Sequence, residues 1–111
     1  LGDVRSKAVT QFKIASLRLD RNEQQTEEGF LAIFESLREA FDIAAQMRIP
    51  DGISAVGPLY AQFLAVGQAF AAALQVLAQV DEACAVLGDE AGRQWAADLR
   101  QQIEAMPGGQ A

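Results

Sequence analysis

The sequence predicts an all-α fold of five helices, arranged as two and a half antiparallel helical hairpins. The segment at 30–52, FLAIFESLREAFDIAAQMRIPDG, aligns without a gap on 70–92, FAAALQVLAQVDEACAVLGDEAG, at an offset of 40 residues. Repetition at such a period is typical of helical repeat proteins. In both copies apolar residues recur every three or four positions, as they do on one face of a helix. A small up-and-down helical bundle is the alternative architecture.

The expected helices span residues 4–21, 27–48, 54–67, 69–87 and 90–106. Asp3, Thr26 and Asp89 stand where a side-chain oxygen can cap the first free N–H groups of the first, second and fifth helices. Gly88 is typical of a helix end and marks the stop of the fourth helix.

Two prolines affect the middle of the chain. Pro50 ends the second helix, because proline has no N–H and disfavours helical geometry in the residue before it. Pro58 lies inside the apolar pattern of the third helix. We therefore expect that helix to begin late, at Gly57, or to have a distorted first turn.

The repeat extends outwards from the two long copies. Three further helix-sized segments align when Ser6, Gly52 and Gly92 share one column: KAVTQFKIASL, ISAVGPLYAQFL and RQWAADLRQQI. The first connection is longer than the second, since 13 residues separate Leu17 from Phe30 whereas 7 separate Phe63 from Phe70. The segment RLDRNEQQTEEG at 18–29 therefore carries an excess of six residues.

Composition indicates one compact domain. Half of the 111 residues are apolar and three are proline, so we expect a single helical domain at 1–106 and a flexible tail at 107–111. Glutamines interrupt the most apolar stretch at helical spacing, which argues against a membrane span. No leader with a basic and then an apolar region is visible, so we expect a cytoplasmic protein, although its first residue, Leu1, indicates that the chain is processed, trimmed or cut from something longer.

The segment Leu64–Asp89 resembles the second half of a tetratricopeptide repeat in its longer bacterial form of about 40 residues. The segment has a glycine, an aromatic residue and small and large residues at the positions of that pattern. It ends in a Leu-Gly-Asp turn at 87–89. These positions are Gly67, Phe70, Ala73, Leu77 and Val80. The first copy departs from the pattern with Arg-Ile-Pro-Asp at the turn, and the intervening helices lack the family's tryptophan, leucine-glycine and tyrosine signature.

The resemblance implies a stack of helix pairs whose first helices line a groove that binds a peptide or helix of a partner protein. The family's lysine and asparagine clamp for a terminal carboxylate does not carry over, because the corresponding positions hold other residues: Phe12 and Ser16, Pro58 and Gln62, Asp98 and Gln102. A groove with these side chains suits an apolar or amphipathic helix. The candidate partner-binding residues are Phe12, Ser16, Gln62, Val66, Trp95, Asp98 and Gln102.

Catalysis, cofactors and metals are not expected. The chain has no histidine, which is the commonest general base near neutral pH and a common metal ligand. Glu35 and Glu39 form a carboxylate cluster beside Arg38, and we interpret this cluster as a solvent-exposed helix face. Cys84, the only cysteine, lies on the inward stripe and is expected to be a small buried side chain.

Charge is distributed unevenly. Residues 1–21 carry a net charge of +3 and the remainder carries −9, which gives −6 for the chain. Binding to nucleic acid or to an anionic membrane is therefore not expected. The basic first helix either balances the acidic second helix within the fold or contacts an acidic partner.

Two other functions stay open at the level of sequence. Homo-oligomerisation through the first helix or through the excess segment at 18–29 is one. A small-molecule sensor with an apolar pocket beside Tyr60 and Phe63 is the other. Trp95 either fills the core or anchors a partner.

Overall fold

The computed structural model describes residues 3–106 and contains five α-helices and one short 3-10 helix in that range. No strand occurs among these residues, so the all-α class is confirmed. The expected tail at 107–111 lies outside the described residues. The elements are α1 (Asp3–Asp20), η1 (Glu23–Gln25), α2 (Glu27–Gln46), α3 (Pro50–Val66), α4 (Phe70–Leu87) and α5 (Glu90–Glu104).

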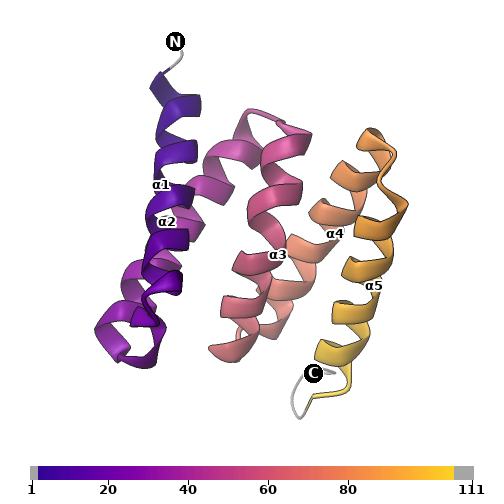
Figure 1. Ribbon diagram of the computed structural model, residues 1–111. Coiled ribbons are helices and arrows are strands. Elements are labelled where there is room, and N and C mark those ends of the chain that lie inside the picture. The colour runs from indigo at the N-terminus through magenta and orange to yellow at the C-terminus, as the bar shows by residue number, and fades with distance from the viewer. Residues whose placement is uncertain (1–2, 107–111) are drawn as a thin grey trace.

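The helices form two layers. Each helix packs mainly against the next one along the chain, so the chain alternates between the layers. Figure 1 shows α1, α3 and α5 in front and α2 and α4 behind them. The shortest dimension of the molecule is 21 Å, which corresponds to two helices of about 10 Å diameter each. We call α1 and α2 the first helix pair, and α3 and α4 the second.

Three inter-helix turns share one backbone geometry. Arg48, Gln68 and Gly88 adopt left-handed conformations with φ of 54°, 65° and 72°. In each turn, the following residue donates its N–H to a carbonyl five residues back, as Ile49 does to Ala44 at 2.9 Å. This pattern is the Schellman motif, which satisfies the last carbonyls of a helix. The three left-handed residues are 20 positions apart, so the backbone repeats at half the period seen in the sequence.

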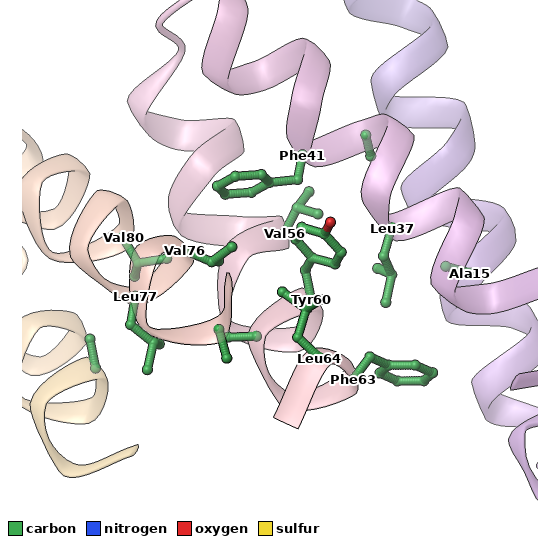
Figure 2. Packing of buried hydrophobic residues seen from close by; sticks show 14 of the residues in the cluster. Ala15, Leu37, Phe41, Val56, Tyr60, Phe63, Leu64, Val76, Leu77 and Val80 are labelled. Carbon is green, nitrogen blue, oxygen red and sulfur yellow. The ribbon is translucent and has the colours of Figure 1, made fainter. Parts of the chain in front are cut away.

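Burial follows the 40-residue repeat. Leu37 and Leu77, which are aligned, are both buried, and the aligned Met47 and Leu87 are both exposed. Figure 2 shows Val56 and Tyr60 of α3 between Leu37 of α2 and Val76 of α4. The two copies therefore direct matching faces into one continuous core.

Aromatic rings join α2 to α3. The rings of Phe30 and Phe63 stack with centroids 4.8 Å apart. Tyr60 contacts Phe34 at 5.6 Å and Phe41 at 5.3 Å in tilted arrangements. These pairs lie within the preferred range for aromatic contacts and fix α2 against α3.

Two predicted caps are confirmed. The Thr26 side chain accepts a hydrogen bond from the Gly29 N–H at 3.0 Å, and the Asp89 side chain accepts one from the Gly92 N–H at 2.9 Å. The side chain of Asp3 lies outside the described residues.

The expected late start of the third helix is wrong. The helix begins at Pro50, which occupies its first position, and continues through Pro58 to Val66. Proline suits the first position because the N–H it lacks has no intrahelical partner there. At Pro58 one intrahelical hydrogen bond is lost, but the apolar contacts on both sides of α3 stabilise the helix. Tertiary packing thus overrides a local preference.

The excess segment folds into a compact corner. It forms η1, which packs against both α1 and α2. Arg18 pairs with Glu23 at 2.9 Å across this corner. A Cβ atom at Gly29 would lie only 1.8 Å from the Glu23 carbonyl oxygen, so only glycine permits this close approach. The extra residues therefore change how α1 connects to α2.

Candidate functional site

An apolar groove lies between α1 and α3, over α2. Its volume is about 980 Å³. Fourteen residues line it: Ala8, Val9, Phe12, Lys13, Ser16, Leu17, Asp20, Ala40, Ala44, Ile49, Asp51, Gly52, Ala55 and Val56. The apolar lining distinguishes this groove from the hollow behind α1 and α2, whose lining includes Lys7, Glu35, Arg38, Glu39 and Asp42.

The walls of the groove expose large apolar side chains. Val9 and Leu17 of α1 are 51% and 56% exposed. They lie on the same helical face as the half-buried Phe12. Ala55 is an exposed residue on the opposite wall. These side chains leave apolar surface in contact with water, which is typical of a binding surface when the residues are contiguous.

Small side chains form the floor. Ala40 and Ala44 of α2 line the groove but are almost completely shielded from solvent by the walls. Their aligned counterparts in α4 are Val80 and Cys84, which are larger and buried. Likewise the counterpart of Ala55 is Trp95. The groove therefore coincides with positions where the first copy has alanine and the second has a larger residue.

A glycine lies at the contact between the two helices of the second pair. Gly57 of α3 lies directly over α4, because a Cβ atom there would be 2.3 Å from Val80 Cγ2. The aligned residue in α1 is Gln11, which lines the polar hollow formed with α2. In addition, α3 contacts α5, whereas α1 and α3 make at most a marginal contact and have the groove between them.

Three charged side chains line the groove. Asp51 stands in the first turn of α3, Lys13 in the middle of α1 and Asp20 at the end of α1. All three are exposed. None forms an ion pair with another side chain in the described part of the chain. They are therefore available to a ligand that approaches the groove.

The structure places two of the predicted site residues in this groove. Phe12 and Ser16 are half-buried on the α1 wall. Gln62 and Val66 are exposed on α3 and do not line the groove, and Val66 is 71% exposed. The four residues are thus not brought together around one groove.

The predicted residues of α5 also lie elsewhere. Trp95 is 39% exposed, so it does not fill the core. Asp98 accepts a hydrogen bond from the Gln94 side chain at 2.9 Å, and Gln102 is exposed. In the repeat alignment, Gln62, Val66 and Trp95 correspond to Ser16, Asp20 and Ala55 of the groove. The predicted residues therefore occupy matching faces of both helix pairs, and among them only Phe12 and Ser16 of the first pair line the groove.

Several groove residues were missed by sequence reasoning, among them Val9, Leu17 and Ala55. One feature of the sequence could have pointed to these residues, namely the difference in side-chain size between aligned positions. Three of the groove residues are alanines where the second copy has valine, cysteine or tryptophan: Ala40, Ala44 and Ala55. Sequence alone does not show whether neighbouring helices close the space beside these alanines.

The space beside Tyr60 and Phe63 is filled. Both residues are buried, and the rings of Phe30, Phe34 and Phe41 contact them. The expected small-molecule pocket at this place is therefore wrong, because α2 supplies the aromatic side chains that occupy it.

Burial and neighbouring charges define the surroundings of three other ionisable side chains outside the groove: Cys84, Tyr60 and Lys7. Burial raises the pKa of the Cys84 thiol, and the carboxylates of Asp89 and Asp81 raise it further, so the thiol is protonated at neutral pH. Burial also raises the pKa of Tyr60. Lys7 of α1 pairs with Glu39 of α2 at 2.8 Å, so part of the basic first helix balances the acidic second one. Within residues 3–106, no cluster of three or more His, Cys, Asp or Glu residues could hold a metal ion.

The helix α4 is long and apolar enough to cross a membrane by length and composition alone. A core helix meets the same test, and α4 buries one face against its neighbours. No protein-family model, no curated protein and no solved structure matches this chain significantly. The resemblance to tetratricopeptide repeats therefore stays a prediction.

Proposed function

We propose that this chain is a non-catalytic interaction module that holds a peptide or helix of a partner protein in the groove between α1 and α3. The main support is the apolar strip on α1, where Val9 and Leu17 are more than half exposed inside a groove of about 980 Å³. A groove of this kind favours an apolar ligand face, because burial stabilises by about 25 cal/mol for each Å² of apolar surface removed from water.

The proposal includes no catalytic residue, cofactor or metal. It also excludes nucleic acid and anionic membranes as partners, because the net charge of −6 repels polyanions. The tetratricopeptide-like arrangement supports the same function but extends the groove to α5, through Trp95, Asp98 and Gln102. The structure favours a shorter site, since those residues do not line the groove.

The test compares two matched substitutions. Leu17→Asp and Val66→Asp each place a carboxylate on an exposed apolar residue near the end of a helix, but only Leu17 lines the groove. A displayed library of helical peptides is first selected against the wild-type protein, and the affinity of the selected peptides is then measured by fluorescence anisotropy. We expect Leu17→Asp to weaken binding about tenfold or more, which is about 1.4 kcal/mol, and Val66→Asp to change it less than twofold.

Circular dichroism controls for folding in both variants. If Leu17→Asp leaves affinity unchanged, or if Val66→Asp weakens it equally, the groove is not the binding site. A library that yields no binder to the folded wild-type protein contradicts the proposal as a whole.

A second copy of the chain is the alternative partner, because exposed apolar residues on α1 also suit self-association: Val9, Ile14 and Leu17. Sedimentation velocity at two protein concentrations distinguishes the two functions. A dimer that dissociates in Leu17→Asp supports homo-oligomerisation, whereas a monomer at both concentrations supports the binding of a different protein.

A further inference from the structure

We infer that the occupant of the groove is an amphipathic helix of about three turns, with a basic residue near each end of its groove-facing side and an acidic residue between them. The inference rests on the proposed function and adds to it the conformation and the charge pattern of the partner.

The length follows from the α1 wall. The lining residues of α1 run from Ala8 to Asp20, which corresponds to about 18 Å of helix at about 1.5 Å for each residue. A helix of about three turns lying along α1 covers the same distance.

A helical conformation follows from hydrogen bonding. Both walls and the floor are helices, whose backbone groups bond internally, so the groove offers no strand edge to an extended peptide. An extended peptide in this groove would bury backbone N–H and C=O groups without partners. A helix satisfies these groups itself and presents only side chains. The alanines on the walls, such as Ala8 and Ala55, further allow a helix to approach closely.

The charge pattern follows from the three charged lining residues. Figure 1 shows that α1 and α3 run in the same direction, so both helices start at the same end of the molecule. Asp51 therefore stands at one end of the groove and Asp20 at the other, with Lys13 between them. The order along the groove is negative, positive, negative. A partner helix with the opposite order places an opposite charge beside each of them.

The experiment reverses the charges of the groove and of its ligand in turn. The ligands are two synthetic helical peptides of 14 residues. Both carry the same leucine and alanine stripe, and charged residues on the opposite side of each peptide compensate to give the same net charge. On the groove-facing side, peptide one has lysine near each end and glutamate between, and peptide two has the reverse. Their dissociation constants are measured by anisotropy with the wild-type protein and with the variant Lys13→Glu/Asp20→Lys/Asp51→Lys. All three substituted side chains are exposed, so the fold is retained, which circular dichroism checks.

We expect the wild-type protein to prefer peptide one about tenfold and the triple variant to prefer peptide two. Higher salt should reduce both preferences, because the charges are exposed. The matched control is Asp98→Lys, which reverses an exposed carboxylate outside the groove and should leave the preference for peptide one intact.

Two results overturn the inference without touching the proposed function. One is equal binding of both peptides that is lost in Leu17→Asp, which shows a groove that ignores the charge pattern. The other is a loss of preference in Asp98→Lys as large as in the triple variant, which shows only a long-range effect of net charge. Failure of both peptides to bind also overturns it, while the selected peptides of the library test the proposed function separately.

Discussion

The first helix pair leaves a groove beside α1, whereas in the second pair α3 lies close on α4 and also contacts α5. The sequences of α2 and α4 align at an offset of 40 residues, and the aligned core residues Leu37 and Leu77 are both buried. The difference includes other buried positions of this core. Ala40 and Ala44 of α2 align with the larger Val80 and Cys84 of α4. Two helices with matching core positions can thus differ in the groove beside them when a few of their buried side chains are smaller.

The close approach of α3 to α4 is the second part of this difference. Gly57 lets α3 pack directly on Val80, whereas the aligned residue of α1 is Gln11. The six-residue excess adds to it, since η1 and Gly29 form a corner that the second pair does not contain. The first pair is therefore less closely packed, and its outer helix carries the exposed apolar strip.

The largest expected effect tests whether α2 and α4 contribute equally to the common core. Leu37→Ala and Leu77→Ala each remove a buried side chain, and each should lower the free energy of unfolding by about 3 kcal/mol. Urea denaturation followed by circular dichroism measures both values. A difference of more than about 1.5 kcal/mol between the two variants, judged against the usual spread of such substitutions, contradicts the idea of a shared core.

A smaller effect tests the close packing of the second pair. Alanine usually stabilises a helix interior relative to glycine by about 1 kcal/mol. In Gly57→Ala, however, the new Cβ would lie 2.3 Å from Val80 Cγ2 and 3.3 Å from Phe41 Cε1. Because overpacking costs about 1–3 kcal/mol, we expect a net loss of about 1 kcal/mol in urea denaturation.

The control for this prediction is the same substitution in a Val80→Ala background. There the 2.3 Å contact with Val80 disappears and only the milder 3.3 Å contact with Phe41 is left. Gly57→Ala should therefore be close to neutral or stabilising, and the two substitutions should be non-additive. Stabilisation by Gly57→Ala alone would show that α3 is not constrained by contact with α4.

The smallest effect concerns the three turns that share one backbone geometry, which follow α2, α3 and α4. Arg48 and Gln68 adopt the left-handed conformation that Gly88 also has. A side chain in this conformation costs about 1 kcal/mol or more, partly offset by the greater freedom of glycine in the unfolded chain. We expect Arg48→Gly and Gln68→Gly to raise the free energy of unfolding by about 0.5 kcal/mol each, and Gly88→Ala to lower it by about 1 kcal/mol. Thermal denaturation measures the three shifts, and a destabilising Arg48→Gly would show that its side chain has a structural role.

The sequence by itself determined the helical class, the number of helices, the repeat and the face of each helix that enters the core. These features follow from local properties: apolar residues at helical spacing, as at Phe30, Ile33 and Leu37, and capping residues such as Thr26 and Asp89. The start of α3 was not determined in this way. Its apolar contacts with α2 and α4 keep Pro58 within the helix despite the lost hydrogen bond.

Only the tertiary structure decided where the surface is open. The sequence places Phe12 and Gln62 on equivalent helical faces, but Phe12 lines a groove and Gln62 does not. The groove depends on how far apart α1 and α3 lie, and these helices are separated by the whole of α2 along the chain. The periodicity of the sequence predicts the direction in which a side chain points. Whether that side chain then meets a neighbouring helix or an open groove depends on how the helices pack.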